Sequence, residues 1–455
     1  MRKQLRRAAV ASAIGTLGLG ALISPASAQS DDLKSKVQEL EQQLKILQRQ
    51  IELQNEAAAE KAKATPVISA GASGFSFRSA DSNFVLRLRG YLQADTRWYI
   101  DDAEAGRAND TFLLRRVRPI FEGTVWDKYD FRVMLDFGSA VNSSANNNAY
   151  LQDAYFTARW FPELQLVGGK MKEPVSLERL QSGANLLFVE RGYTAQVAPN
   201  RDVGCLFQGD LFDTLTYQVG AFNGVADGGS ADIESADDEK DVVARLFAHP
   251  FRRTAIEPLK ELGIGVAGTY GNQEGALRSF TSPGQQRIFA YSSTAVADGD
   301  HWRVAPQGYW YWGPFGLFGE YIVSNQKVVN GAAADQLEHS AWQVAASYVL
   351  TGEKNSWRGI APKRPFSLSN GGWGAFEIAA RCQELSLDDD TFPTFASATG
   401  NASEAKSWAV GLNWHLNRNF KLQVNYEKTD FDDGGTSELL SDGEQIVFTR
   451  AQISF

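Results

Sequence analysis

Phe84-Val-Leu-Arg-Leu-Arg-Gly-Tyr-Leu-Gln-Ala-Asp-Thr-Arg-Trp-Tyr99 is the stretch that decides the fold, because its residues alternate with a period of two. The even-numbered positions are mostly apolar, whereas the odd-numbered positions include Arg, Gln and Asp. Successive side chains of a strand point to opposite faces, so one face can contact lipid while the other contacts water. The pattern predicts a strand of a transmembrane β-barrel.

Similar stretches recur along the rest of the chain. With 84–99 they make about sixteen, an even number, as bacterial single-chain barrels require. The others are expected at 112–126, 129–138, 149–160, 163–171, 203–211, 214–223, 241–249, 261–271, 301–312, 314–324, 339–351, 372–386, 404–416, 419–431 and 444–455. We therefore predict an all-β fold, a sixteen-stranded antiparallel transmembrane β-barrel over residues 84–455.

The connections between these stretches alternate in length. Tight turns are expected near residues 126–129, 161–162, 212–213, 313–314 and 417–419, and the links between them are long and polar. Aromatic residues cluster at the ends of the stretches, and both features are typical of outer-membrane barrels. Two links on the side of the short turns, 250–260 and 352–371, are longer than this pattern predicts.

Both ends of the chain carry export features. Basic residues, an apolar run over 8–23 and small residues at Ala26 and Ala28 predict a signal peptide over residues 1–28. An uncleaved anchor is less favoured, because the run is shorter than the ~20 residues that a helical span needs. The last stretch ends on Phe455, and a terminal aromatic residue there looks like the signal read by barrel assembly machinery.

The segment after the signal peptide has a different period. Apolar residues follow one another in steps of four and three at Leu33, Val37, Leu40, Leu44, Leu47 and Ile51. These are a and d positions of a short periplasmic coiled coil over 29–56, although a single amphipathic helix on a surface is the alternative. Residues 57–83 turn to Ala, Lys, Thr, Pro and Gly, and they are expected to form a linker.

Composition excludes several classes of function. The formal charge is −9, and the chain stays acidic without its signal peptide, so a nucleic-acid partner is not expected. Two cysteines, Cys205 and Cys382, cannot form a disulfide framework, and four scattered histidines match no metal-ligand spacing. No Ser or Cys lies near a His in a recognisable catalytic arrangement. We therefore expect neither a cofactor nor an enzyme.

Five segments carry a resemblance to a known family. They are Phe112-Leu-Leu-Arg-Arg-Val-Arg118, Tyr129-Asp-Phe-Arg-Val-Met-Leu-Asp-Phe-Gly138, Val167-Gly-Gly-Lys-Met-Lys-Glu-Pro174, Gly411-Leu-Asn-Trp-His-Leu-Asn417 and Thr449-Arg-Ala-Gln-Ile-Ser-Phe455. These segments resemble the phosphate-selective porin O and P family, and the resemblance spans most of the chain from about Phe84. It implies a trimeric barrel in which the loop after the fifth strand folds into the lumen and narrows it.

The resemblance also implies where charge would act. Phosphate-selecting members of the family are thought to line the pore with an arginine ladder, which Arg115 and Arg116 match here, and to place lysines at the constriction. The constriction loop corresponds to roughly 172–202, and the cations in and beside it are Lys170, Lys172, Arg179, Arg191 and Arg201. The same segment holds Glu173, Glu178, Glu190 and Asp202, so tight phosphate selection does not follow.

Alternation assigns a set of arginines to the lumen: Arg87, Arg89, Arg97, Arg116, Arg118, Arg132, Arg159, Arg245, Arg381 and Arg450. Arg115 falls on the lipid side by strict alternation, so either it sits near the membrane interface or a bulge shifts the phase. Inward positions also hold Asp and Glu residues. Two hypotheses therefore stay open: the opposite charges pair and brace the wall without strong ion preference, or the arginines make the channel anion-selective.

These features together predict a bacterial outer-membrane porin, a passive channel for small hydrophilic solutes with a modest preference for anions such as phosphate. The expected partners are outer-membrane lipid, small anionic or polar solutes, and further copies of the chain in a homotrimer. The alternatives are a general porin without anion preference and a mainly structural barrel that tethers the outer membrane to the cell wall.

Overall fold

The structure, a computed structural model, describes residues 26–100, 109–138, 149–232, 238–433 and 443–455. The chain divides into two units, residues 1–65 and 66–455. In the first unit the structure describes one helix, α1 (Ala26–Ala64). No described helix is both long enough and apolar enough to cross a membrane. The signal peptide expected over residues 1–28 lies almost entirely outside the described residues.

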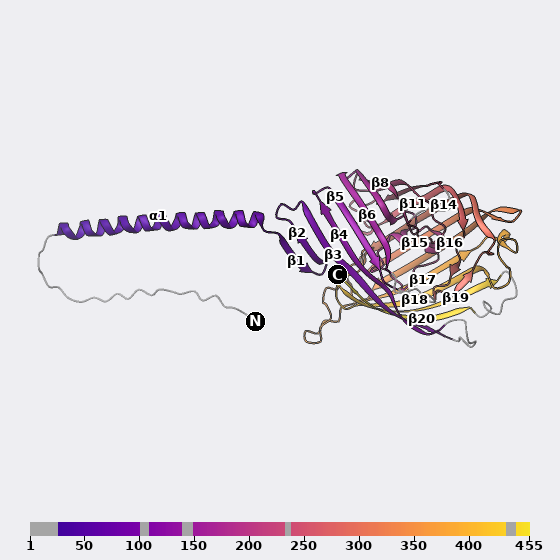
Figure 1. Cartoon of the computed structure of the whole chain (residues 1–455). Coiled ribbons are helices and arrows are strands. Elements are labelled where there is room, and N and C mark those ends of the chain that lie inside the picture. Colours follow the sequence, from indigo (N-terminus) through magenta and orange to yellow (C-terminus); the bar gives the residue numbers. More distant parts are fainter. Residues whose placement is uncertain (1–25, 101–108, 139–148, 233–237, 434–442) are drawn as a thin grey trace. The chain divides into compact units, whose positions relative to one another are not determined.

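The second unit is a closed antiparallel barrel (Figure 1). Sixteen strands form its wall, and the ring closes because β20 (Glu444–Ser454) pairs with β3 (Phe84–Tyr99). The strands between them are β4 (Thr111–Val125), β5 (Tyr129–Asp136), β6 (Tyr150–Phe161), β7 (Leu164–Lys172), β8 (Arg201–Leu211), β9 (Leu215–Phe222), β10 (Asp241–Ala248), β11 (Gly263–Ala276), β14 (Ala295–Trp312), β15 (Phe315–Asn330), β16 (Ala333–Val349), β17 (Ala375–Ser386), β18 (Ala402–His415) and β19 (Phe420–Asp433). The prediction of a sixteen-stranded antiparallel barrel is confirmed.

The two faces of the wall differ as the alternation predicts. On β10, Val242 and Leu246 are 54% and 51% exposed, whereas Asp241 and Arg245 are buried inside. An arginine on the lipid face at mid-membrane would cost ~2–4 kcal/mol, so the polar face must point inward. Cys205 and Cys382 are exposed free thiols, so the barrel is held without a disulfide between them.

One expected long loop is absent from the described wall. Strands β14, β15 and β16 are longer than predicted, and Gly331 and Ala332 alone connect β15 to β16. The stretch between the predicted strands continues the alternation, with Val328 and Leu337 buried on the inner side, so the chain gains by extending the ladder. Gly331 has φ +63°, a conformation that a tight turn needs and glycine adopts readily.

Three segments enter the barrel from its two ends. The first is the loop after the fifth wall strand, residues 173–200, which we call the inner loop; it contains α2 (Leu177–Leu180) and α3 (Thr194–Val197). The second is the hairpin of β12 (Phe280–Thr281) and β13 (Arg287–Phe289) between β11 and β14. The third is part of the long link between β16 and β17, where the ring of Trp357 stacks on Tyr309 with centroids 5.2 Å apart.

Short 3-10 turns occupy two of the remaining links. They are η1 (Glu257–Leu259), between β10 and β11, and η2 (Asp389–Thr391), between β17 and β18. The first accounts for part of the long link at 250–260, and its Pro258 carbonyl accepts a bond from the indole of Trp310 at 2.6 Å.

The prediction of a linker over 57–83 is wrong in most of its length. Helix α1 continues to Ala64, and β1 (Val67–Gly71) and β2 (Gly74–Arg78) form a hairpin. β2 pairs with β3 over residues 85–88, whereas β20 pairs with β3 over residues 91–99. The hairpin therefore continues the row of β20 past the end of the chain, where Phe455 and Gly90 exchange two backbone bonds of 3.0 Å (Figure 1).

The turn of this hairpin explains why the segment is rich in glycine. Gly74 has φ +91°, and a Cβ there would lie 2.3 Å from the Leu88 carbonyl oxygen. A side chain at this position would therefore keep β2 away from β3. The apolar side chains Phe75 and Phe77 are paired in register with Leu88 and Leu86, so they extend the outer apolar face.

The N-terminal unit agrees with the helical part of its prediction. Helix α1 leaves Leu33, Val37, Leu40, Leu44 and Leu47 between 50% and 63% exposed. A coiled coil needs a second helix, which the structure of one chain does not contain. The coiled coil over 29–56 thus stays a prediction.

Removing the β1–β2 hairpin should weaken the seam of the barrel. Deleting residues 66–79 leaves the backbone of β3 at 85–88 unpaired on one side, and each lost hydrogen bond costs ~0.5–1.5 kcal/mol. We expect the folded band on a detergent gel to disappear at a temperature several degrees lower. Deleting residues 29–60 is the control and should leave that temperature unchanged; equal shifts in both deletions would contradict a role for the hairpin.

Candidate pore constriction

The inner loop lies inside the barrel and is bonded to its wall on more than one side. Its apolar patch is buried, with Leu186, Phe188 and Val189 at 2%, 3% and 0% exposed. Polar side chains of β18 and β19 donate to its backbone: Asn413 donates to Leu187 O at 3.0 Å, and Gln423 donates to the same oxygen at 3.2 Å. An apolar patch on an extracellular tip would contact water, so this burial explains its composition.

The start and end of the inner loop meet at a carboxylate of β15. Glu320 accepts the backbone N–H of Leu177 at 2.7 Å and the hydroxyls of Ser176 and Thr194 at 3.1 Å and 2.5 Å. Ser176 is also the N-cap of α2, where its hydroxyl accepts the N–H of Arg179 at 3.2 Å. One buried wall residue thus fixes both short helices of the loop.

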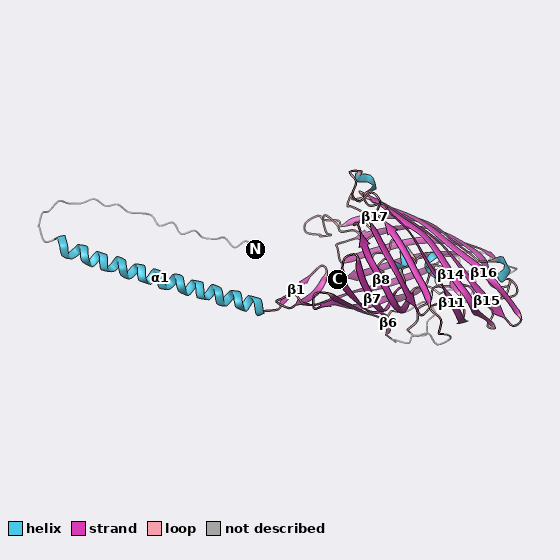
Figure 2. Cartoon of the chain, turned by 90° about the horizontal axis from the view of Figure 1, so that it is seen from above, coloured by secondary structure: helices cyan, strands magenta, loops and turns pink. Residues whose placement is uncertain are grey.

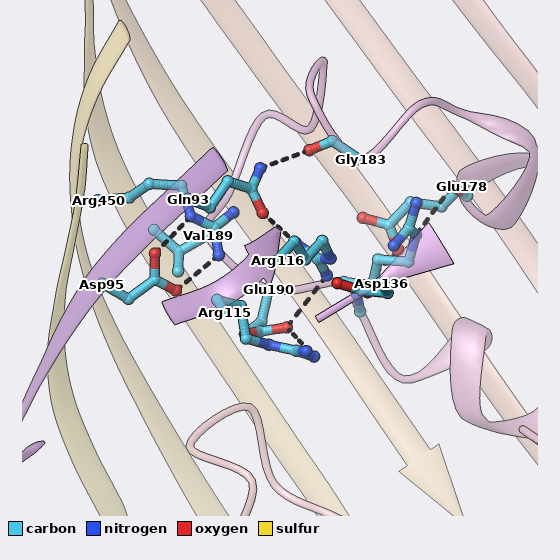
Figure 3. Close-up of polar contacts among 12 residues, drawn as sticks. Gln93, Asp95, Arg115, Arg116, Asp136, Glu178, Gly183, Val189, Glu190 and Arg450 are labelled. Atoms are coloured by element: carbon cyan, nitrogen blue, oxygen red, sulfur yellow. Dashed lines mark hydrogen bonds and ion pairs between the residues drawn. The ribbon is translucent and has the colours of Figure 1, made fainter. Parts of the chain in front are cut away.

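Glu190 binds the inner loop to the first two wall strands (Figure 3). Its Oε1 lies 2.7 Å from Arg115 Nε, and its Oε2 lies 3.7 Å from Arg116 Nη2. The same Oε1 lies 2.7 Å from Arg97 Nη2. Arg116 also donates to Gln93 at 2.9 Å. The arginines of β3 and β4 that were expected to line the pore therefore contact Glu190 of the inner loop here.

A bulge on β4 brings Arg115 into this cluster. Gln93 pairs with Arg116 and Ala94 pairs with Leu114, so Arg115 has no partner across the ladder. The extra residue shifts the phase, and Arg115 reaches Glu190 although strict alternation assigns it to the lipid face. Of the two alternatives for Arg115, the structure shows the bulge that shifts the phase.

A chain of alternating charges runs along the inner wall from β3 to β8. Arg89 contacts Glu122 at 2.9 Å, and Glu122 contacts Arg132 at 2.8 Å. Asp153 then joins Arg132 to Arg201, at 3.1 Å and 2.7 Å. These residues come from five strands, and their pairing matches the hypothesis that opposite charges brace the wall.

The other arginines assigned to the lumen have varied surroundings. Carboxylates pair with most of them: Arg118 with Asp136 at 2.6 Å, Arg159 with Asp130 at 2.6 Å, Arg450 with Asp95 at 2.7 Å and Arg381 with Glu427 at 3.1 Å. Arg245 donates instead to the amides of Gln307 and Gln218, and Arg87 is exposed near one end of β3.

The cations expected in and beside the loop are mostly bonded to backbone. Lys172 donates to Gln181 O at 3.0 Å, Arg179 to Ala195 O at 2.8 Å, and Arg191 to Gln181 O at 2.9 Å. Lys170 instead pairs with Asp232. A carbonyl carries no net charge, so these bonds do not offset positive charge as an ion pair with a carboxylate would.

A cavity of about 350 Å³ lies between the inner loop and the wall of β3 to β9. We call it the cationic chamber, because its lining includes Arg118, Arg132, Lys172 and Arg201 but Asp153 as its one carboxylate within the described residues. Glu122 and Asp136 pair with Arg132 and Arg118 from outside this lining, and an excess of positive charge is left when they are counted. Tyr91 and Tyr155 add phenol groups to the lining.

Two buried cations of the lumen escaped the sequence analysis. Arg303 is 0% exposed and contacts Asp227 at 2.7 Å and Asp241 at 3.5 Å. Lys421 donates to Leu186 O of the inner loop at 3.1 Å. Both lie at positions that alternation assigns to the inner face of their strands. Assigning faces over the whole of β14 and β19 could therefore have found them.

Comparisons with known proteins agree with this architecture. The family model of the phosphate-selective porin O and P family matches residues 86–455. Porin O of Pseudomonas aeruginosa is 24% identical over 411 residues, which cover 84% of this chain and 91% of that protein.

Two solved structures share the fold. The outer-membrane channel DcaP of Acinetobacter baumannii has a TM-score of 0.55 and 14% identity, over 85% of this chain and 100% of that one. The trimer form of OmpT from Vibrio cholerae has a TM-score of 0.52 and 11% identity, over 82% of this chain and 99% of that one. Because the family model covers most of the chain, this protein belongs to the phosphate-selective porin O and P family of the bacterial outer membrane.

Proposed function

We propose that this porin is a passive channel for small hydrophilic solutes that favours anions modestly, phosphate among them. The observation that carries the proposal is the cationic chamber, whose lining holds four cations and one carboxylate. Fixed charges in a narrow passage act strongly on a partly dehydrated ion, so a positive chamber favours an anion. The family name points the same way.

The preference should be modest because many lumen arginines are neutralised. Arg89, Arg132 and Arg201 share two carboxylates, Glu122 and Asp153. The field at the chamber is therefore the small difference between opposing charges. It is also screened over ~8–10 Å at physiological ionic strength.

The inner loop is proposed as the constriction. It crosses from its root at β7 and β8 to β15 and to β18 and β19, where Glu320, Asn413 and Gln423 hold it. The cationic chamber lies between this loop and the wall of β3 to β9.

Two other functions are compatible with the fold. A general porin without anion preference follows if the charge pairs of the wall cancel fully. A barrel that tethers the outer membrane to the cell wall through α1 would not need an open pore. The planar-bilayer conductance of the purified protein separates the tether from both channels.

Neutralising a chamber cation should weaken the anion preference. Removing one charge about 10 Å from the ion path changes the energies of an anion and of a cation by ~0.4 kcal/mol each in water, in opposite directions, so their permeability ratio changes roughly fourfold. We expect Arg132→Gln and Lys172→Gln each to shift the zero-current potential in a KCl gradient toward cation permeability.

The matched control for these variants is Arg253→Gln, since Arg253 is exposed and pairs with Asp213 in a turn. The anion preference of the wild type should fall as the salt concentration rises. A wild-type channel that prefers potassium at low salt would refute the proposal.

Removing the inner loop should widen the channel. Deletion of residues 176–196 removes the segment that crosses the lumen, so single-channel conductance should rise if the barrel still assembles. Heat-modifiable mobility on a detergent gel reports assembly. An assembled deletion variant with unchanged conductance would show that the constriction lies elsewhere.

A homotrimer is the proposed assembly, supported by the heptads of α1 and by the trimer form of the OmpT structure. The helix offers about three heptads, too few for a stable assembly alone, so contacts between barrels should dominate. Native mass spectrometry in detergent should show a trimer before and after deletion of residues 29–60. A monomer at all concentrations would exclude this assembly.

A further inference from the structure

Glu190 occupies a special place in the lumen. Its side chain is 7% exposed, and those of Arg97 and Arg116 are 0% and 3% exposed. Three guanidinium groups surround one carboxylate, so the cluster carries two positive charges in excess (Figure 3). Without that carboxylate the arginines would repel one another, since water does not reach them freely.

The backbone beside Glu190 is bonded to the other side of the barrel seam. Val189 N–H donates to the Asn425 side chain of β19 at 2.7 Å, and Arg381 of β17 donates to Glu190 O at 3.1 Å. The seam itself is the pairing of β20 with β3. Through residues 189 and 190, the inner loop is therefore bonded to strands on both sides of the seam.

Arg97 extends the same cluster to a second inserted segment. It donates to Gly284 O, in the turn between β12 and β13, at 3.0 Å, while it contacts Glu190 through its other amino group. Tyr99 donates to the same carbonyl at 2.7 Å. The inner loop and the inserted hairpin thus meet at one arginine of β3.

We infer that Glu190 sets how strongly the positive charge of the β3 and β4 arginines acts on ions in the pore. We also infer that it fixes the inner loop to these two strands. This inference rests on the proposed channel function, and it deepens that function by naming a residue that lowers the preference for anions. The carboxylate cancels one of three neighbouring charges, and its contacts with Arg97, Arg115 and Arg116 hold the loop against β3 and β4. Without the Glu190 carboxylate, the wall arginines would make the channel more selective for anions, and the inner loop would be held less firmly.

The test measures zero-current potential and open-channel current noise in a KCl gradient. Glu190→Gln keeps the size of the side chain and removes the charge. We expect a roughly fourfold rise in the anion-to-cation permeability ratio, as for one charge about 10 Å from the ion path. Noise should rise as the loop loosens. Glu163→Gln is the control, because Glu163 is exposed in the turn between β6 and β7.

A double variant separates charge from position. Glu190→Gln with Arg115→Gln restores two positive charges to the cluster, so the permeability ratio should return to the wild-type value while the noise stays high. Assembled Glu190→Gln protein with wild-type potential and noise would overturn the inference. If Glu190→Gln does not assemble, Glu190→Asp keeps the charge on a shorter side chain; wild-type ratio with raised noise supports the inference, and wild-type noise overturns it.

These outcomes are distinguishable from failure of the proposed function. A wild-type channel without anion preference, in which Glu190→Gln still shifts the potential toward anions, would refute the proposed preference and leave the role of Glu190 intact. If the wild type prefers anions and Glu190→Gln does not change that preference, the proposed function stands and the role of Glu190 is refuted.

Discussion

The rest of the structure depends on one constraint: backbone polar groups that face hydrocarbon must be paired within the protein. Lipid offers no hydrogen-bond partner, so a sheet can cross a membrane when it closes and has no edge. Closure here takes place between β3 and β20, and Phe455 ends the row. The β1–β2 hairpin continues that row and pairs with residues 85–88 of β3, whereas β20 pairs with residues 91–99.

Closure of the barrel also creates a wide lumen lined by charged side chains, and these charges need partners. The protein fills it with segments from both ends of the barrel and satisfies the charges by pairing. Burying an unpaired charge costs several kcal/mol, so arginines without water contact need carboxylates or carbonyls. Arg450 with Asp95, Arg381 with Glu427 and Arg303 with Asp227 all follow this rule.

The selectivity that we propose depends on the charge that this pairing leaves unneutralised. Between β3 and β9 the cations outnumber the carboxylates, and Lys172, Arg179 and Arg191 are bonded to uncharged carbonyls of the inner loop. At the seam, Glu190 offsets part of the positive charge of β3 and β4. The observed bracing and the proposed ion preference thus depend on the same charges, which is why counting arginines in the sequence could not separate them.

The sequence by itself determined the strands, their faces and the closed antiparallel barrel, because alternation is a local property: residues 84–99 and 129–136 are strands that the pattern located within two residues at each end. Tertiary structure alone decided the partners. Arg115 reaches Glu190 through a bulge in the register of β3 and β4, and 75 residues separate the two in the chain. The hairpin at 67–78 has the composition of a linker. Its pairing with β3 depends on how the barrel closes, which composition does not show. Register and the path of the inserted loops are set by contacts between distant segments, and no local pattern records them.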